Sequence, residues 1–205
     1  MKTTRFVALD TGPRQSGYAR GHLTDGIMSF QLCDVLDNDL ILCGLRESGA
    51  GDVLLYERFQ SMGMAVGESV MESIMWAGRF SEAGDVAGAE VIGVTRREVK
   101  LSLCNNMRAK DANIRQALID KIGEPTVPSL EYVVRRIDKT RALRVFPTSH
   151  EAESWIAERG LDDMLIRSRE GGSRPNPVYG PVPPVSHAWS AIAVAYVGLT
   201  MGGGA

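Results

Sequence analysis

The alternation of hydrophobic and polar positions in the first half of the chain predicts strands and helices in turn. Three short strands in immediate succession, as in an antiparallel meander, are expected at residues 5–10, 16–22 and 27–33. Asp25-Gly26 supplies the hairpin turn between the second and third strands, because glycine tolerates the backbone angles of a tight turn. A helix over 35–47 precedes a continuous apolar strand at 53–57, which we expect to lie parallel to the first strand.

The alternation continues as far as residue 122. Apolar residues at helical spacing predict a helix over 66–83 and a buried stripe made of Val66, Val70, Ile74 and Ala77. A further strand and two helices are expected at 91–94, 96–104 and 111–122.

Beyond residue 125 the pattern loosens. We expect a strand at 143–146, a helix at 149–159 and an exposed loop at 169–184, where Gly and Pro are frequent. A last helix, opened by Ser186 as N-cap, runs to about residue 201. We interpret the chain as one α/β domain over residues 1–205, interrupted by an insertion at about 125–182.

The composition excludes several classes of protein. The chain has 205 residues, of which 44% are hydrophobic and 23% charged, which argues against a disordered chain and a polytopic membrane protein. A net charge of -2 argues against nonspecific coating of nucleic acid, although a local basic patch stays compatible with it. The three cysteines form no CxxC pair, so neither a zinc site nor a disulfide framework is indicated. No segment has the length of a signal peptide or a membrane span, and we expect a cytoplasmic protein without a membrane partner.

Two carboxylates, Asp10 and Glu57, come at the carboxyl ends of two predicted core strands. Ligands of open α/β sheets bind at that edge, and a carboxylate pair with one further ligand suits Mg²⁺ or Mn²⁺. His187, in the first turn of the last helix, is the third candidate. The structural alternative also stays open, with Asp10 as a turn residue and Glu57 in a salt bridge with Arg58.

Other charged residues have a weaker claim to the site. Glu68 and Glu72 lie four residues apart on one helix face; they are either part of a solvated face or reserve metal ligands. Positive charge gathers in about twenty residues and is either a solvated surface or a set of DNA phosphate contacts. Its members are Arg96, Arg97, Lys100, Arg108, Lys110 and Arg115.

Three motifs together resemble the RuvC-type Holliday junction resolvases. The stretch from Leu9 to Tyr18, LDTGPRQSGY, is similar to their first-strand motif, in which Asp-x-Gly-x-x-x-x-Gly follows a hydrophobic strand. Leu54-Leu-Tyr-Glu57 resembles their second acidic motif, and the stretch SHAWSAIAVA at 186–195 resembles their terminal one. The resemblance covers about 1–122 and 178–200, and the stretches 57–80 and 94–122 are most similar to the phage-encoded branch.

The resemblance implies a ribonuclease H-like fold, a five-stranded mixed sheet flanked by helices. It also implies a homodimeric endonuclease of DNA recombination and repair that nicks two strands of a four-way junction with Mg²⁺ or Mn²⁺, two ions per site. Asp10 and Glu57 match the first two metal ligands, and His187 matches a position that is Asp or His among relatives. Ser190 falls where many relatives keep a final Asp, so that His187 with Glu68 or Glu72 completes the site, or the second ion is weakly held.

Two alternatives to a nuclease remain. The replacement at Ser190 is compatible with a protein that binds branched DNA and has lost catalysis. An ATPase of the actin or sugar-kinase type also begins with Asp-x-Gly, but it needs two such domains and a second phosphate motif. This chain shows neither, so no nucleotide cofactor is expected.

Overall fold

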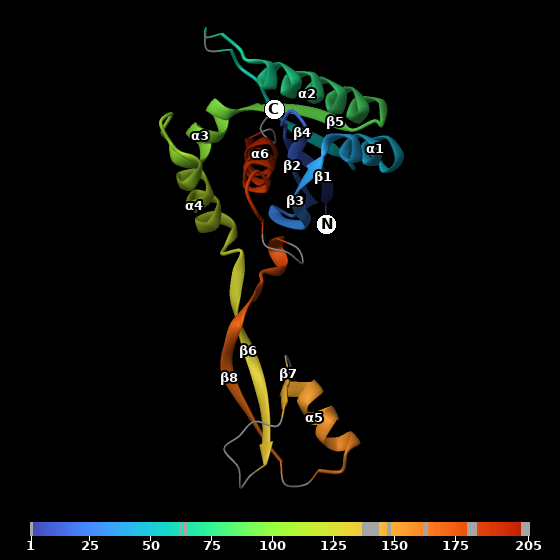
Figure 1. Ribbon diagram of the computed structural model, residues 1–205, viewed down its shortest axis with the longest axis vertical. Coiled ribbons are helices and arrows are strands. Elements are labelled where there is room, and N and C mark those ends of the chain that lie inside the picture. Colours follow the sequence, from blue (N-terminus) through green and yellow to red (C-terminus); the bar gives the residue numbers. More distant parts are fainter. Residues whose placement is uncertain are drawn as a thin grey trace. The chain divides into compact units, whose positions relative to one another are not determined.

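The computed structural model describes residues 2–61, 63, 65–136, 144–146, 149–161, 164–179 and 184–201. The chain divides into two compact units (Figure 1). The first comprises Met1–Pro125 and Pro175–Ala205, and the second comprises Thr126–Arg174.

The first unit is built on a five-stranded mixed sheet with the order β3-β2-β1-β4-β5. Its strands are β1 (Thr3–Asp10), β2 (Gln15–Thr24), β3 (Ile27–Asp37), β4 (Val53–Arg58) and β5 (Glu90–Thr95). The first three form the predicted antiparallel meander, and β4 lies parallel to both β1 and β5. Asp25 and Gly26 take φ angles of 49° and 84°, as the tight turn between β2 and β3 requires.

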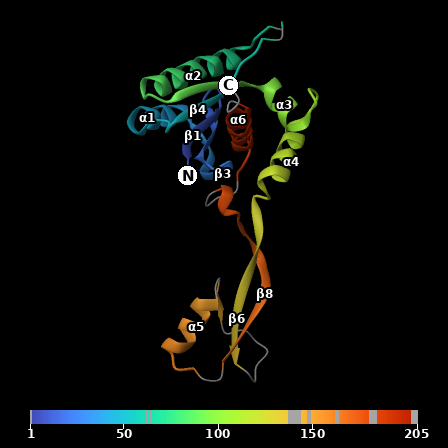
Figure 2. The same ribbon diagram turned by 180° about the vertical axis from the view of Figure 1, so that it is seen from behind.

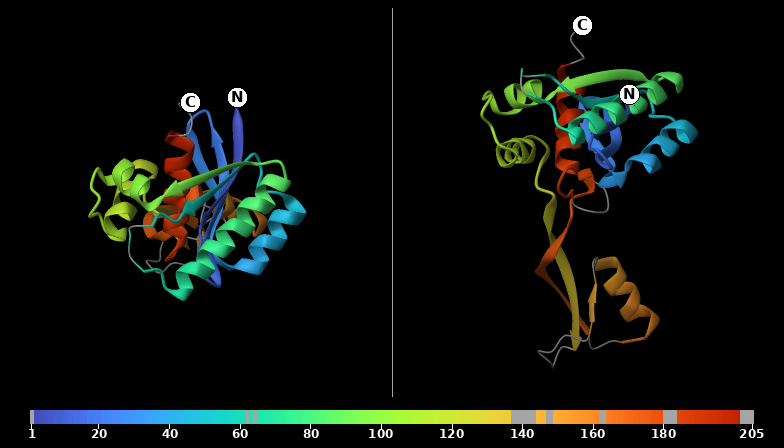
Figure 3. Two further views of the ribbon diagram at one scale, coloured as in Figure 1. Left: turned by 90° about the horizontal axis from the view of Figure 1, so that it is seen from above. Right: turned by 45° about the horizontal axis from the view of Figure 1, so that its top comes forward.

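Helices cover both faces of this sheet: α1 (Asn38–Ser48), α2 (Glu68–Val86), α3 (Arg96–Cys104), α4 (Asp111–Ile122) and α6 (Ala188–Met201). Figure 2 shows β1 and β4 between α1 and α6. Side chains alternate along β1, so that Val7 and Leu9 pack in the layer of α1 and α2, whereas Phe6 and Ala8 pack in the layer of α6. The left view of Figure 3 shows the sheet between these layers. The predicted α/β fold class, a five-stranded mixed sheet flanked by helices, is confirmed. None of the described helices is both long enough and apolar enough to cross a membrane.

Several details of the first unit differ from the prediction. Helix α6 begins at Ala188, so Ser186 and His187, which were expected to open it, lie before the helix. Helix α1 begins at Asn38, not at residue 35, because β3 continues to Asp37 in register with Gln15 of β2. The buried stripe predicted from Val66 to Ala77 is wrong in its first half: Val66 lies before α2, which begins at Glu68, and Val66 and Ile74 are each 37% exposed. Only the second half of α2, from Ala77 onward, packs on the sheet, while the first half borders an open cleft described below.

The second unit is a three-stranded sheet with the order β7-β6-β8 and one helix. Its elements are β6 (Thr126–Arg136), β7 (Arg144–Phe146), α5 (Ser149–Glu158) and β8 (Met164–Pro175). Val134, Phe146 and Ala152 form its small core. The loop predicted over 169–184 is wrong in its first part, because β8 continues to Pro175; residues 180–183 lie outside the described residues. Pairing with β6, which the sequence pattern did not indicate, gives the Gly-rich segment the hydrogen bonds of a strand.

Candidate active site

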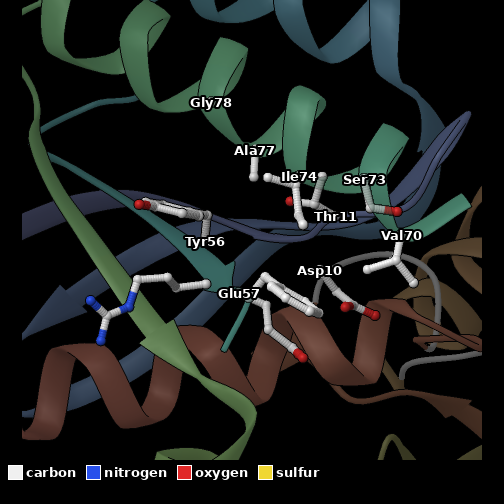
Figure 4. A pocket seen from close by; sticks show the side chains of 11 residues that line it. Asp10, Thr11, Tyr56, Glu57, Val70, Ser73, Ile74, Ala77 and Gly78 are labelled. Carbon is white, nitrogen blue, oxygen red and sulfur yellow. The ribbon is translucent and has the colours of Figure 1, made fainter. Parts of the chain in front are cut away.

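Asp10 and Glu57 lie side by side at the carboxyl edge of the sheet. The parallel strands β1 and β4 are in register up to the pair Leu9–Tyr56, and the two carboxylates are the next residues along. Their side chains are 17% and 22% exposed, so each is largely buried yet reachable from solvent. Figure 4 shows both at the border of one cavity. The structure thus brings together the two acids that the sequence placed at strand ends.

The environment of Glu57 disfavours its charged form. Burial is the main cause, followed by the negative charge of Asp10, and Arg96 opposes both; the pKa of Glu57 is raised to about 7. Two acids that share a partly buried cleft repel each other when both are ionised. A divalent cation would relieve this repulsion and compensate the lost hydration.

The turn after Asp10 is fixed by a buried polar network. Ser16 Oγ donates to Asn38 Oδ1 at 2.6 Å, and Asn38 Nδ2 donates to the carbonyl oxygen of Gly12 at 2.9 Å. The Ser16 hydroxyl in turn accepts from the Gly12 N–H at 3.2 Å. Ser16 and Asn38 are each 1% exposed, so these bonds are shielded from water and hold the turn in one conformation. Neither residue was predicted, because a polar residue at the start of a strand or within a helix gives no sign in the sequence that it is buried.

The start of α6 brings His187 to Asp10. His187 directly precedes the helix, and its Nδ1 lies 3.0 Å from Asp10 Oδ2, while its side chain is 70% exposed. This approach depends on Gly17 of β2, since a Cβ atom there would lie 2.2 Å from the His187 carbonyl oxygen. The second glycine of the Asp-x-Gly-x-x-x-x-Gly motif therefore serves the contact between β2 and the start of α6.

Arg96 lies in the site and was expected on the DNA-binding surface. Its Nη1 is 3.3 Å from Glu57 Oε2 and 3.5 Å from Ser190 Oγ, and its Nη2 pairs with Asp111. A capping box of Thr95 and Glu98 starts α3 immediately after β5 and so places Arg96 at the sheet edge. Asp111 was not predicted as part of the site, and its only signal in the sequence is its position in the first turn of α4.

Three clefts meet at Glu57. The first, of about 320 Å³, contains the polar groups described above, namely Asp10, Glu57, Arg96, Asp111, His187 and Ser190. The second, of about 390 Å³, is basic and is bordered by Arg58, Arg96, Arg97 and Lys100. The third, of about 490 Å³, lies between β4 and α2 and is largely apolar (Figure 4). A strand of nucleic acid in the basic cleft would therefore have Glu57 at its edge.

The chain is similar to solved structures of RuvC. One is "T. thermophilus RuvC in complex with Holliday junction substrate", with 15% identity, a TM-score of 0.47, and coverage of 79% of this chain and 99% of that one. Another is "Thermus thermophilus RuvC structure", with 14% identity, a TM-score of 0.44, and coverage of 78% and 98%. No protein-family model matches the chain, and no curated protein matches its sequence.

The remaining candidate residues are spread over the first unit. Glu68 and Glu72 are exposed on α2 and border none of the three clefts. Arg97 and Lys100 border the basic cleft, but Arg108, Lys110 and Arg115 do not. The Arg115 guanidinium lies over the ring of Trp189, 4.9 Å from its centroid, which ties α4 to the start of α6.

The side chains at this edge fit a divalent ion held by few protein ligands better than an ion enclosed by protein ligands on all sides. Among the described residues, no three His, Cys, Asp or Glu side chains group closely enough to hold a metal. Mg²⁺ needs no such cage, because it is commonly held by one or two carboxylates, several waters and substrate phosphates. The Thr11 hydroxyl, in the same cleft as Asp10 and Glu57, is buried without a hydrogen-bond partner among the described residues, and a water on such an ion would satisfy it. Asp10 and Glu57 therefore have the chemistry of a Mg²⁺ or Mn²⁺ site.

Proposed function

We propose that this protein is a metal-dependent DNA endonuclease that resolves four-way or other branched DNA junctions by paired nicking. The observation that carries the proposal is the pair of partly buried carboxylates, Asp10 and Glu57, of which Glu57 also borders a basic cleft. The three sequence motifs support it independently, since they include both acids and His187.

Asp10 and Glu57 would hold Mg²⁺ or Mn²⁺. A bound ion of this kind supplies Lewis acidity and a water activated for in-line attack on a phosphodiester. His187 is oriented by Asp10 through Nδ1, so its Nε2 is the atom that would carry a proton to or from a phosphate oxygen. Hydrogen bonds from Ser16 and Asn38 keep the Asp10 turn from moving during the reaction.

The basic cleft would bind the sugar-phosphate backbone. Arg97 is exposed and Lys100 half-buried, both on α3 beside Glu57, so phosphates held there lie next to the carboxylates. Such contacts release counterions and make binding weaken as salt rises. The resemblance further suggests a phage-encoded homodimer, in which two sites would nick two strands. Apolar residues on α2, Met71 and Met75, are 57% and 64% exposed and belong to the candidate dimer surface.

A nicking assay tests the proposal. A synthetic four-way junction and an unbranched duplex of the same sequence are incubated with the protein, with and without Mg²⁺ or Mn²⁺. We expect paired nicks in the junction only with metal, and none from Asp10→Asn, which should keep its junction affinity because Asp10 is not part of the basic cleft. Full cutting by Asp10→Asn would refute the assignment.

A second candidate function is a branched-DNA-binding protein that has lost catalysis. The observation in its favour is that Arg96 contacts both Glu57 and Ser190. A hydroxyl and a cation therefore lie beside Glu57, whereas many RuvC-type resolvases have an Asp at the position of Ser190. This function predicts salt-dependent junction binding without nicks at any metal concentration. The nicking assay thus separates the two candidates.

A further inference from the structure

The Arg96 guanidinium lies beside Ser190, at the position where the terminal motif of many RuvC-type resolvases keeps a final Asp. Arg96 joins three elements through Glu57 of β4, Ser190 of α6 and Asp111 of α4. Its side chain is 30% exposed and borders both the polar and the basic cleft. An arginine side chain stays charged at every physiological pH, so this positive charge is permanent.

The charges around the polar cleft favour one divalent ion over two. Asp10, Glu57 and Asp111 bring three negative charges when ionised, and Arg96 brings one positive charge. One divalent ion therefore balances the cleft. A second ion on the Ser190 side would meet a fixed positive charge and a neutral hydroxyl in place of a carboxylate, so repulsion would be left uncompensated.

We propose that Arg96 takes the place of a second metal ion: each chain binds one divalent ion, at Asp10 and Glu57, and the Arg96 guanidinium supplies the second positive charge to the DNA phosphate. The inference rests on the proposed function. Three of the five N–H donors of Arg96 contact Glu57, Ser190 and Asp111, which leaves two without a partner among the described residues and available to phosphate oxygens. Glu57 and Asp111 fix the group in advance, as electrostatic catalysis requires.

The number of Mn²⁺ ions bound per chain tests the proposal directly. It is measured on the full chain without DNA, by electron paramagnetic resonance of the free ion. We expect one Mn²⁺ per wild-type chain and loss of binding in Asp10→Asn. Arg96→Gln removes the competing cation from Glu57 and should bind Mn²⁺ about tenfold more tightly. Arg46→Gln, the same change on α1, is the control; Arg46 is exposed and borders none of the three clefts, so Mn²⁺ affinity should stay as in wild type.

Nicking of the four-way junction by Arg96→Gln should fall about 100-fold despite the tighter metal, because a charge on the phosphate is lost. Two Mn²⁺ ions, or none, per wild-type chain would overturn the inference, as would an Arg96→Gln affinity that is unchanged or weaker. The wild-type count needs no variant, so a misfolded Arg96→Gln would not rescue the inference. Two bound ions with nicking would overturn the inference and leave the proposed function standing. One bound ion without nicking would overturn the proposed function, and with it the role of Arg96 at the phosphate, and would leave only the one-ion site.

Discussion

Replacing Glu57 with glutamine is expected to stabilise the metal-free protein at about pH 8, although it removes a residue of the proposed active site. Burial and the charge of Asp10 raise the pKa of Glu57 from its ordinary value of 4.5 to about 7. The folded state therefore binds a proton at Glu57 that the unfolded chain releases. The stabilising effect of this group is complete below about pH 4.5 and is lost as the pH rises through about 7.

The size of the effect follows from the pKa difference. Each pKa unit corresponds to about 1.4 kcal/mol, so ionised Glu57 costs the folded state about 3 kcal/mol at alkaline pH. A glutamine at this position resembles the protonated acid in shape and charge. The variant should therefore be more stable than wild type by up to about 3 kcal/mol at about pH 8 and nearly equal to it at about pH 4.

Urea denaturation in the presence of a chelator, at both pH values, provides the assay. Glu82→Gln is the matched control, because Glu82 is exposed on α2, and its stability should follow wild type at both pH values. Added Mg²⁺ should stabilise wild type and reduce the difference, since the ion compensates the charge at Glu57. A Glu57→Gln variant that is equal to or less stable than wild type at the alkaline pH would refute the electrostatic description of the site.

Two further predictions concern the contacts around the site. Gly17→Ala places a methyl group 2.2 Å from the His187 carbonyl oxygen. It should lower the free energy of unfolding in urea by about 1–3 kcal/mol and weaken nicking. Unchanged stability would show that the start of α6 is free to shift. Lys100→Gln should lower the slope of log affinity against log salt for the junction by about one, and an unchanged slope would place the DNA backbone outside the basic cleft.

The local pattern of the sequence was sufficient for most of the first unit. A strand that ends in a carboxylate, repeated after a helix, predicts parallel neighbours with their acids at one edge, and β1 and β4 confirm that arrangement. Helices α3 and α4 begin and end as predicted, because their apolar spacing and flanking residues mark them locally. The sequence could thus place Asp10 and Glu57 beside each other without any long-range information.

What the sequence did not show depends on packing between distant segments. Arg96 looked like one of several surface cations, since nothing local indicates that β5 ends beside Glu57 or that α6 brings Ser190 to the same point. The apolar stripe of α2 predicted burial along its whole length, but half of the helix extends beyond the sheet core. The glycines of β8 favoured a loop until pairing with β6 was known.

The central claim is that Asp10 and Glu57 form one catalytic site, and the nicking rates of four proteins test it most directly. Wild type, Asp10→Asn, Glu57→Gln and the double variant are compared on a labelled four-way junction with saturating Mg²⁺. Residues that act as a unit are strongly non-additive, so each single variant should fall to background and the double variant should be no slower than either. Nicking at the wild-type rate by either single variant would contradict the account.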